Sequence, residues 1–259
     1  MALPFATPSF LAEGFSISYC TPADADIVAD VYYEAFATDR RNTFWWPPNK
    51  EDMFAWMKRR ILRKMDDRRV RHFKITDHKS GDVVAFARWD IPEGYGKAFG
   101  EWIGDEGSTI DVSQIVKAGK EDAAEDTPTN SAPVEAINPP FADYPKGSKP
   151  ELCKVFFDAL KVASAKHNAD AMLGLSLLCT SPKYYRRGAA KALLEPMLAI
   201  ADAHGLKSYL EATPNGKGVY EKMGFREVDR LTFDLKELTG EDYGDIYHIT
   251  IMVREPRSI

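Results

Sequence analysis

The sequence has few cysteines, no excess of positive charge and no long apolar run. Its three cysteines, Cys20, Cys153 and Cys179, show no CxxC spacing and no nearby histidine pair, which argues against a disulfide framework and against a zinc site. No metal is therefore expected, and a reducing compartment, the cytoplasm, fits best. The net charge of the chain is -5, so the protein does not have the strongly positive surface that is typical of nucleic-acid-binding proteins. No nucleic-acid partner is therefore expected.

Membrane insertion and secretion are disfavoured as well. The longest apolar stretch, residues 171–179, is about half of the roughly 18 residues that a membrane-spanning helix requires. The first fifteen residues contain Pro4 and Pro8 and lack the basic leader of a secretory signal. With 44% hydrophobic residues in 259 positions, the chain can bury a full core, and no membrane partner is expected.

Apolar periodicity predicts an α/β chain in which strands and helices alternate. The expected strands are 15–19, 70–75, 83–89, 171–180, 207–211, 225–235 and 247–253. The expected helices are one that starts at Pro22 and keeps an apolar face to Ala35, one at 50–65, one behind residues 148–151 that ends near 168, and two at 188–204 and 216–223. Residues 79–82 are rich in turn formers, which predicts an antiparallel hairpin around them. Ser148-Lys149-Pro150-Glu151 has the pattern of a capping box and predicts the start of the third helix.

An acidic, proline-rich insertion is predicted at residues 91–150. Residues 101–145 carry ten acidic side chains against two lysines, a net charge of -8, and prolines interrupt any long element there. We therefore predict one domain, residues 1–259, with a mixed central sheet flanked by helices and interrupted by this insertion. The basic stretch at residues 59–71 fits a solvated helix face that the acidic insertion neutralises.

The most informative segment is residues 177–191, where a buried strand runs into a loop that turns at Gly188 and enters a helix. The first N–H groups of a helix have no internal partner and attract phosphate. Three cations and two small residues surround this turn: Arg186, Arg187, Lys191, Ala189 and Ala190. The P-loop pattern GxxxxGK[ST] is absent. The segment thus predicts an anion site, with a charged helix cap on the surface as the alternative.

Two motifs resemble those of the GNAT superfamily of acyl-CoA-dependent N-acyltransferases. Leu177 to Leu194, with Arg186-Arg187-Gly188-Ala189-Ala190, resembles the acyl-CoA-binding motif (Gln/Arg)-x-x-Gly-x-(Gly/Ala), although Tyr185 stands where Gln or Arg is usual. Lys207 to Phe225, with Asn215 and Tyr220-Glu221-Lys222-Met223-Gly224-Phe225, resembles the strand, turn and helix that follow it. The resemblance implies a GNAT-like mixed sheet and acetyl-CoA as the co-substrate.

The resemblance also implies the residues of the cofactor site. Leu178 and Thr180 present backbone groups to the pantetheine arm, residues 186–191 hold the pyrophosphate, and Tyr220 faces the sulfur. The implied cofactor-binding residues are Leu178, Cys179, Thr180, Arg186, Arg187, Gly188, Ala189, Ala190, Lys191 and Asn215. The implied catalytic residue is Tyr220.

Tyr220 has a definite chemical task in this interpretation. Attack of an amine on a thioester expels a thiolate whose conjugate acid has a pKa of about 8.5, so a neighbouring phenol can donate a proton. The alternative is a tyrosine that only packs in the core. The amine must also lose a proton before attack, and Glu34, Asp90, Glu211 or a water chain are open candidates for the base.

The expected function is transfer of an acetyl group from acetyl-CoA to an amine, with a small molecule as the acceptor, by direct attack. Cys179 lies in a buried apolar strand, where a thiol stays protonated, so it is not expected to act as a nucleophile. Three alternatives stay open: a non-catalytic acyl-CoA-binding regulatory protein, a protein N-terminal or lysine acetyltransferase, and an assembly protein. The aromatic run Phe44-Trp45-Trp46-Pro47-Pro48 either lines the acceptor pocket or packs beneath its loop. The oligomeric state is not indicated.

Overall fold

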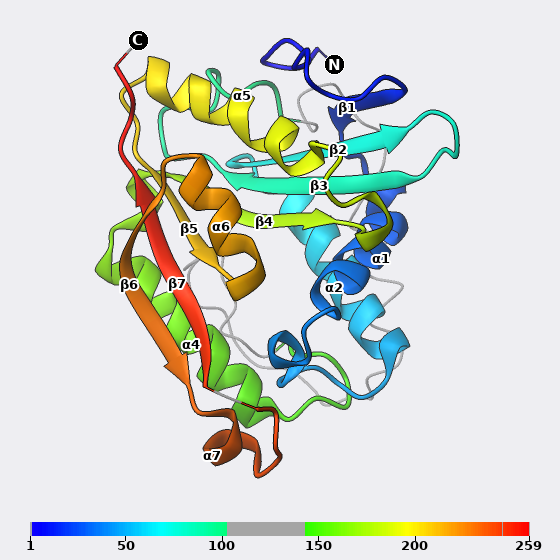
Figure 1. Cartoon of the computed structure of the whole chain (residues 1–259), viewed down its shortest axis with the longest axis vertical. Helices are drawn as coiled ribbons and strands as arrows, with labels where there is room; N and C mark the ends of the chain where they lie inside the picture. Colours follow the sequence, from blue (N-terminus) through cyan, green and yellow to red (C-terminus); the bar gives the residue numbers. More distant parts are fainter. Residues whose placement is uncertain (1, 103–142, 245, 259) are drawn as a thin grey trace, which may run out of the picture.

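A computed structural model describes residues 2–102, 143–244 and 246–258 and shows a seven-stranded mixed sheet (Figure 1). The strand order is β1-β2-β3-β4-β5-β7-β6, and all neighbours are antiparallel except β4 and β5. The strands are β1 (Phe15–Tyr19), β2 (Val70–Asp77), β3 (Val83–Asp90), β4 (Leu173–Thr180), β5 (Ser208–Ala212), β6 (Arg226–Phe233) and β7 (Tyr247–Arg254). The predicted α/β class and the β2–β3 hairpin are confirmed. Most of the predicted insertion, residues 103–142, lies outside the described residues.

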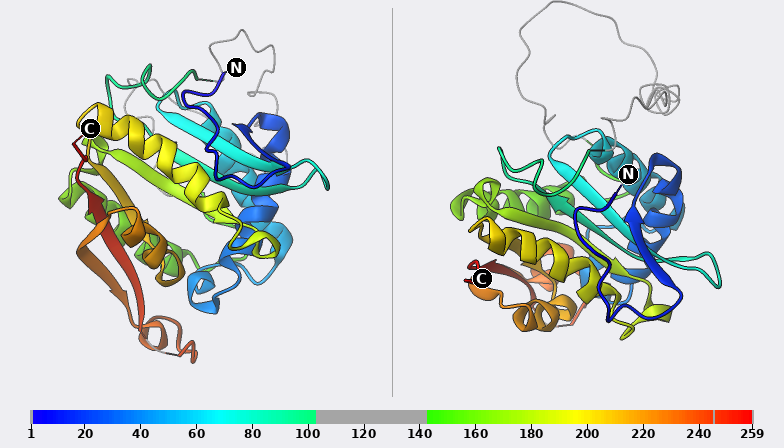
Figure 2. Two further views of the ribbon diagram at one scale, coloured as in Figure 1. Left: turned by 45° about the horizontal axis from the view of Figure 1, so that its top comes forward. Right: turned by 90° about the horizontal axis from the view of Figure 1, so that it is seen from above.

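Helices cover both faces of the sheet (Figures 1 and 2). The longer helices are α1 (Ala25–Phe36), α2 (Lys50–Met65), α4 (Pro150–Lys166), α5 (Ala189–Ala203) and α6 (Pro214–Lys222). The short ones are η1 (Pro22–Asp24), η2 (Arg40–Thr43), η4 (Ala169–Ala171), η5 (Pro182–Tyr184) and α7 (Leu235–Thr239). Residues of α1, α2 and α4 share one buried cluster with the sheet, and residues of α5 and α6 share the other. The sheet therefore separates two hydrophobic cores.

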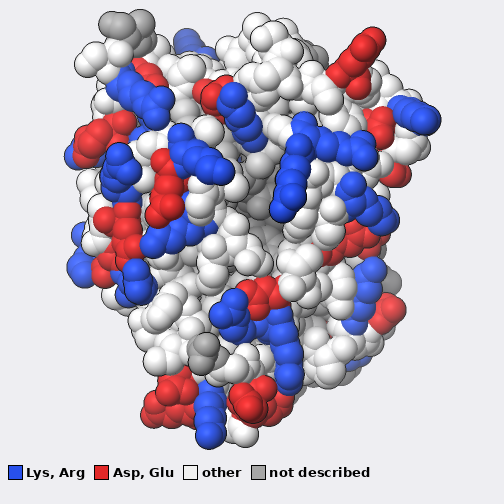
Figure 3. Space-filling model, viewed as in Figure 1, with Lys and Arg blue, Asp and Glu red and all other residues white. Residues whose placement is uncertain are grey.

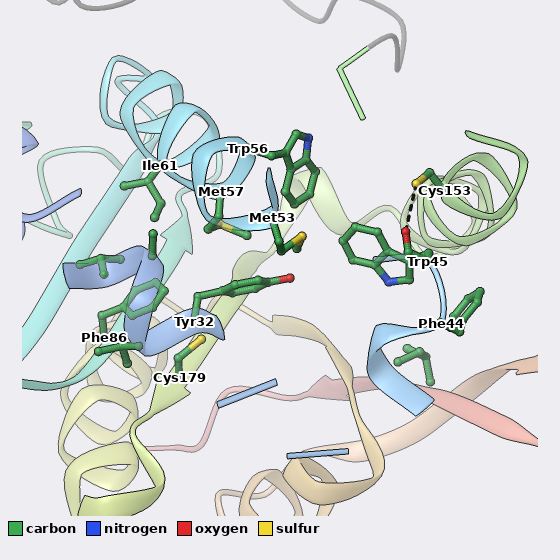
Figure 4. Close-up of a cluster of buried hydrophobic side chains, with 14 of the residues drawn as sticks. Tyr32, Phe44, Trp45, Met53, Trp56, Met57, Ile61, Phe86, Cys153 and Cys179 are labelled. Carbon is green, nitrogen blue, oxygen red and sulfur yellow. Dashed lines mark hydrogen bonds between the residues drawn. The ribbon is translucent and has the colours of Figure 1, made fainter. Parts of the chain in front are cut away.

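The core under α1, α2 and α4 contains the aromatic run that follows η2 (Figure 4). Phe44 and Trp45 are each only 3% exposed, and the Trp45 ring stacks on Phe156 with the centroids 5.4 Å apart. The Cys153 thiol donates to the Trp45 carbonyl oxygen at 3.4 Å. The packing interpretation of this run is confirmed for Phe44 and Trp45, whose burial stabilises the α1–α2 connection.

The structure tests side-chain caps near the start of a helix at two places, before α1 and before α4, and the prediction for α4 was wrong. The Thr21 N–H donates to the Asp24 carboxylate at 2.7 Å, which caps η1, the short turn that leads directly into α1. Ser148 does not cap α4, because its hydroxyl donates to the Pro145 carbonyl oxygen at 2.7 Å. The predicted capping box at residues 148–151 was therefore wrong, and Lys149 occupies the N-cap position without a side-chain bond. The competing bond closes a turn that the sequence pattern does not reveal.

Asp143, near the end of the predicted insertion, contacts side chains of α2. The Trp56 indole N–H donates to the Asp143 carbonyl oxygen at 2.6 Å, and the Asp143 carboxylate lies 3.1 Å from Arg59 and 3.3 Å from Arg63. An acidic residue of the insertion thus neutralises part of the basic stretch, as predicted. No helix within the described ranges is both long enough and apolar enough to cross a membrane.

Candidate active site

The site is built where β4 and β5 part. Leu173, Gly174 and Leu175 pair with β5, but residues 176–180 of β4 do not. The ladder to β3 shifts register at the same point, because Arg88 pairs with Leu177 whereas Trp89 pairs with Leu175. Ser176 is therefore the extra residue of a bulge, and a bulge bends its strand. One edge of β4 beyond Ser176 is left with backbone groups that a ligand can use.

Those free backbone groups belong to predicted cofactor-site residues. Leu178 packs toward the core under α5, while Cys179 faces the opposite core. The space-filling view shows the surface hollowed beside α6, over β4, with Lys and Arg side chains along the upper rim (Figure 3). An extended ligand arm can therefore lie along the Leu178 and Thr180 backbone.

The loop after β4, where the sequence predicts an anion site, turns at Gly188 into the N-terminus of α5; this turn is called the cradle below. Gly188 has φ +80°, a conformation that glycine adopts without strain, and Arg186 also has a positive φ of 62°. The first helical bond of α5 runs from the Ala192 N–H to the Gly188 carbonyl oxygen at 2.9 Å. The N–H groups of residues 188–191 precede that bond and point out of the helix. The small residues Ala189 and Ala190 keep the approach to them open.

Cations surround this cradle. Arg186 and Arg187 are exposed, and the Arg187 guanidinium lies 5.2 Å from the centroid of the Tyr184 ring. The Lys191 ammonium lies 3.4 Å from the Glu195 carboxylate and 4.0 Å from the centroid of the Phe10 ring. Tyr185, which replaces the usual Gln or Arg, is 49% exposed. The cradle therefore combines helix N–H groups with positive charge, which suits a diphosphate.

Tyr220 lies on α6, on the same side of the sheet as α5. Its side chain is 9% exposed and meets the Phe225 ring edge-on, with the centroids 6.1 Å apart. A Cβ atom at Gly216 would lie 3.0 Å from Tyr220 Cε2, so glycine at that position makes room for the ring. Burial raises the pKa of the Tyr220 hydroxyl, which is therefore protonated at neutral pH. Asn215 is exposed in the first turn of the same helix.

Glu211 lies on β5 and faces the opposite side of the sheet. Its neighbours Leu210 and Ala212 belong to the core under α5 and α6, whereas Tyr209 belongs to the other core. Glu211 and Tyr209 line a cavity of about 210 Å³ together with Asp90 and Ser176. Burial, helped by the charge of Asp90, raises the pKa of Glu211 to about 7, and the nearby Tyr209 hydroxyl and Arg88 oppose this rise. A carboxyl with such a pKa can accept a proton at neutral pH.

The other candidate bases have different surroundings. The Glu34 carboxylate accepts a hydrogen bond from the Ser181 hydroxyl at 2.8 Å and lies 3.6 Å from the Lys183 ammonium. Asp90 ends β3 and lines the same cavity as Glu211. Glu34 is thus engaged by Ser181 and Lys183 at the start of the loop that follows β4. Glu211 differs, because its pKa is raised and it lies just beyond the last pair that joins β4 to β5.

Cys179 is 1% exposed, and burial raises the pKa of its thiol. It is therefore a thiol rather than a thiolate at neutral pH. In the described parts of the chain, no three His, Cys, Asp or Glu side chains are grouped so as to hold a metal ion.

Comparison with known proteins agrees with this architecture. Residues 150–234 match the acetyltransferase (GNAT) domain family. The fold is similar to a Corynebacterium glutamicum structure titled histone acetyltransferase HPA2 and related acetyltransferase, with 19% identity, a TM-score of 0.52, and coverage of 95% of this chain and 98% of that one. It is also similar to arylalkylamine N-acetyltransferase 2 from Aedes aegypti, with 14% identity, a TM-score of 0.53, and coverage of 95% and 100%. A search of curated proteins gave no match.

Residues 150–234 are thus similar to the GNAT acetyltransferase domain, and the described chain has the fold of solved acetyltransferases of that kind. The family match spans α4 to β6 and so contains the cradle, Glu211 and Tyr220. The two structures are too distant in sequence to show more than the fold.

Leu178 and Thr180 on β4 and Glu211 on β5 lie beyond the last pair that joins the two strands, and the loop with residues 186–188 follows β4. Three neighbours of these residues were not predicted: Ser176 at the bulge, Gly216 against the Tyr220 ring, and Phe10 beside Lys191. Gly216 carried no clear signal, because it stands in the first turn of its helix and not in the interior, where a glycine would be unusual. Phe10 carried none, since only the fold brings it to Lys191.

Proposed function

We propose that this protein transfers an acetyl group from acetyl-CoA to a small amine. The observation that carries the proposal is the opening between β4 and β5, with Tyr220 on one side of the sheet and Glu211 on the other. A proton donor for the leaving sulfur and a proton acceptor for the amine are both needed, and Tyr220 and Glu211 supply one of each.

The cofactor would occupy the cradle side of the opening. The N–H groups of residues 188–191, with Arg186, Arg187 and Lys191, would hold the diphosphate. Leu178 and Thr180 would hydrogen-bond the pantetheine arm through their free backbone edge, and Cys179 and Asn215 would border it. Acetyl-CoA supplies the thioester carbonyl that the amine attacks. Glycine at position 188 suits this arrangement, because it adopts φ +80° without strain and carries no side chain beside the helix N–H groups.

The residues on either side of the opening account for the proton transfers. Glu211 takes the proton from the acceptor ammonium, whose ordinary pKa is about 10.4, and so frees the nitrogen lone pair. The new C–N bond forms as the C–S bond breaks, and Tyr220 donates its proton to the departing sulfur. The nitrogen loses its second proton as the amide forms, and that proton restores the Tyr220 hydroxyl, while Glu211 releases the first proton to solvent. The products are the acetylated amine, free CoA and one proton. The transferred acetyl group never bonds to the protein, in agreement with the buried, protonated Cys179.

The shape of the acceptor side supports a small molecule. The cavity at Glu211 has a volume of about 210 Å³ and lies between α2, η4 and the strands β3, β4 and β5. A cavity of this size accommodates a compact amine more readily than the surface of a folded protein.

The direct test is release of free CoA from acetyl-CoA in the presence of a panel of primary amines, followed with a thiol reagent. Amine-dependent release with the acetylated amine as product supports the proposal. Tight acetyl-CoA binding without release for any amine would favour a non-catalytic acyl-CoA-binding protein. Absence of acetyl-CoA binding would overturn both interpretations.

A further inference from the structure

The N-terminal segment, residues 2–13, runs alongside α5 (Figure 2). Leu3, Phe5 and Leu11 pack against the core under α5, and the Phe5 ring lies 5.4 Å from the Phe73 ring. The Leu11 N–H donates to the Pro8 carbonyl oxygen at 3.0 Å and closes a turn around Phe10. The segment is thus fixed on both sides of Phe10.

A groove of about 500 Å³ lies between this segment and α5. Its residues are mostly apolar: Pro8 and Phe10 from the segment, and Pro196, Ala199 and Ile200 from the helix. The one charged residue in its lining, Glu195, is paired with Lys191 at 3.4 Å. The groove therefore offers flat apolar walls without an unpaired negative charge.

Phe10 joins this groove to the cradle. A Cβ atom at Gly188 would lie 3.9 Å from the Phe10 carbonyl oxygen and 4.0 Å from its ring. The Lys191 ammonium lies 4.0 Å from the centre of the Phe10 ring. The ring nevertheless stays 39% exposed, which is unusual for a phenylalanine fixed by its neighbours. One aromatic face is thus available directly beside the diphosphate position.

We propose that Phe10 and the groove behind it bind the adenine ring of the acyl-CoA co-substrate. This inference rests on the proposed function, because it requires a CoA diphosphate in the cradle. In CoA, only a ribose separates the diphosphate from the adenine, so a base attached there reaches the adjoining groove. A purine is flat, aromatic and largely apolar on its faces, which matches the Phe10 ring and the Pro8 and Pro196 walls. Lys191 completes the site by meeting both the ring and the diphosphate.

The test compares Phe10→Ala with the unchanged protein on two ligands, acetyl-CoA and S-acetyl-pantetheine, which lacks the adenosine and the phosphates. Stacking of a base on an aromatic ring is worth about 1–3 kcal/mol, so the dissociation constant for acetyl-CoA should rise about 5- to 150-fold in calorimetry. The KM for S-acetyl-pantetheine should not change. Phe10→Trp should restore acetyl-CoA affinity, since it keeps an aromatic face.

A matched control is Tyr243→Ala, because Tyr243 also carries a cation over its ring, with the Arg40 guanidinium 4.4 Å from the centroid. It should leave acetyl-CoA affinity unchanged. Equal losses for both ligands in Phe10→Ala, or no loss for either, would overturn the adenine site. Failure of the unchanged protein to bind acetyl-CoA would instead overturn the proposed function, so the two failures are distinguishable.

Discussion

Leu175 pairs with Leu210, and this pair is the last that joins β4 to β5. The bulge at Ser176 follows immediately, so the two strands diverge at the level of Glu211. Parallel strands are held only by their ladder and by the helices on each side. Here the ladder ends early, with Tyr220 on one side of the sheet and Glu211 on the other. The proposed function depends on this break in the pairing and on both side chains.

The cradle predicts an effect of Gly188→Glu on cofactor affinity. The new carboxylate repels a diphosphate, and the side chain strains a backbone at φ +80°, so the dissociation constant for acetyl-CoA should rise at least about 10-fold. Calorimetry measures the change. Gly188→Asn is the control, because asparagine tolerates the left-handed conformation and carries no charge, and its loss should be smaller. Equal affinity in the glutamate variant and the unchanged protein would contradict the cradle.

Tyr220→Phe should lower kcat about 10- to 1000-fold with little change in acetyl-CoA affinity. The variant keeps the ring that packs against Phe225 and removes only the proton that the leaving sulfur needs. Steady-state kinetics and calorimetry on the same preparation separate the two effects. A kcat equal to that of the unchanged protein would leave Tyr220 as a packing residue.

Glu211 predicts the pH dependence of the reaction. Its pKa of about 7 means that kcat/KM should rise as the pH increases through 7, where the carboxyl loses its proton and becomes a base. In Glu211→Gln the activity should fall about 100-fold or more, and the rise of kcat/KM around pH 7, called the acidic limb of the pH profile, should disappear. Asp90→Asn, in the same cavity, tests the cause: without the Asp90 charge the limb should move to lower pH. An unchanged limb in Glu211→Gln would assign the base elsewhere.

The same group predicts a change in stability. The folded pKa of Glu211 is raised above its usual value of 4.5, so the folded state binds the proton more tightly than the unfolded state. Stability contributed by this group is therefore present below pH 4.5 and is lost as the pH rises through about 7. Glu211→Gln should raise the Tm relative to the unchanged protein at pH 8 and less at pH 5. Thermal unfolding at both pH values checks the sign, and a lower Tm at pH 8 would contradict it.

Cys179→Ala should keep acetyl transfer, because the thiol is buried and protonated and forms no bond to the acetyl group. The expected change in kcat is less than about 10-fold, with a modest loss of stability from the lost packing. Mass spectrometry of the unchanged protein after mixing with acetyl-CoA should show no acetylated cysteine. Acetylation at Cys179, together with an inactive alanine variant, would point to a covalent route.

The sequence by itself determined the local features of this protein. The span of α2, predicted as residues 50–65, and the turn of the chain at Gly188 both follow from side-chain periodicity and backbone preference, which act over a few residues. The two GNAT motifs likewise lie within continuous stretches, so the cradle cations and Tyr220 could be predicted in place. The predicted cap at Ser148 was wrong because the Ser148 hydroxyl bonds to the Pro145 carbonyl oxygen, three residues earlier, instead of to the helix that follows.

Only the tertiary structure decided how distant residues meet. The register of β3 on β4 places the bulge at Ser176, and the register of β4 on β5 ends the pairing at Leu175, neither of which is written in one stretch of chain. The raised pKa of Glu211 depends on burial and on Asp90, which comes from another strand. Phe10 meets Lys191 only because the N-terminal segment packs on α5. Strand register, burial and the distance between charges depend on residues that are far apart in the sequence. They therefore become fixed only when the whole chain folds.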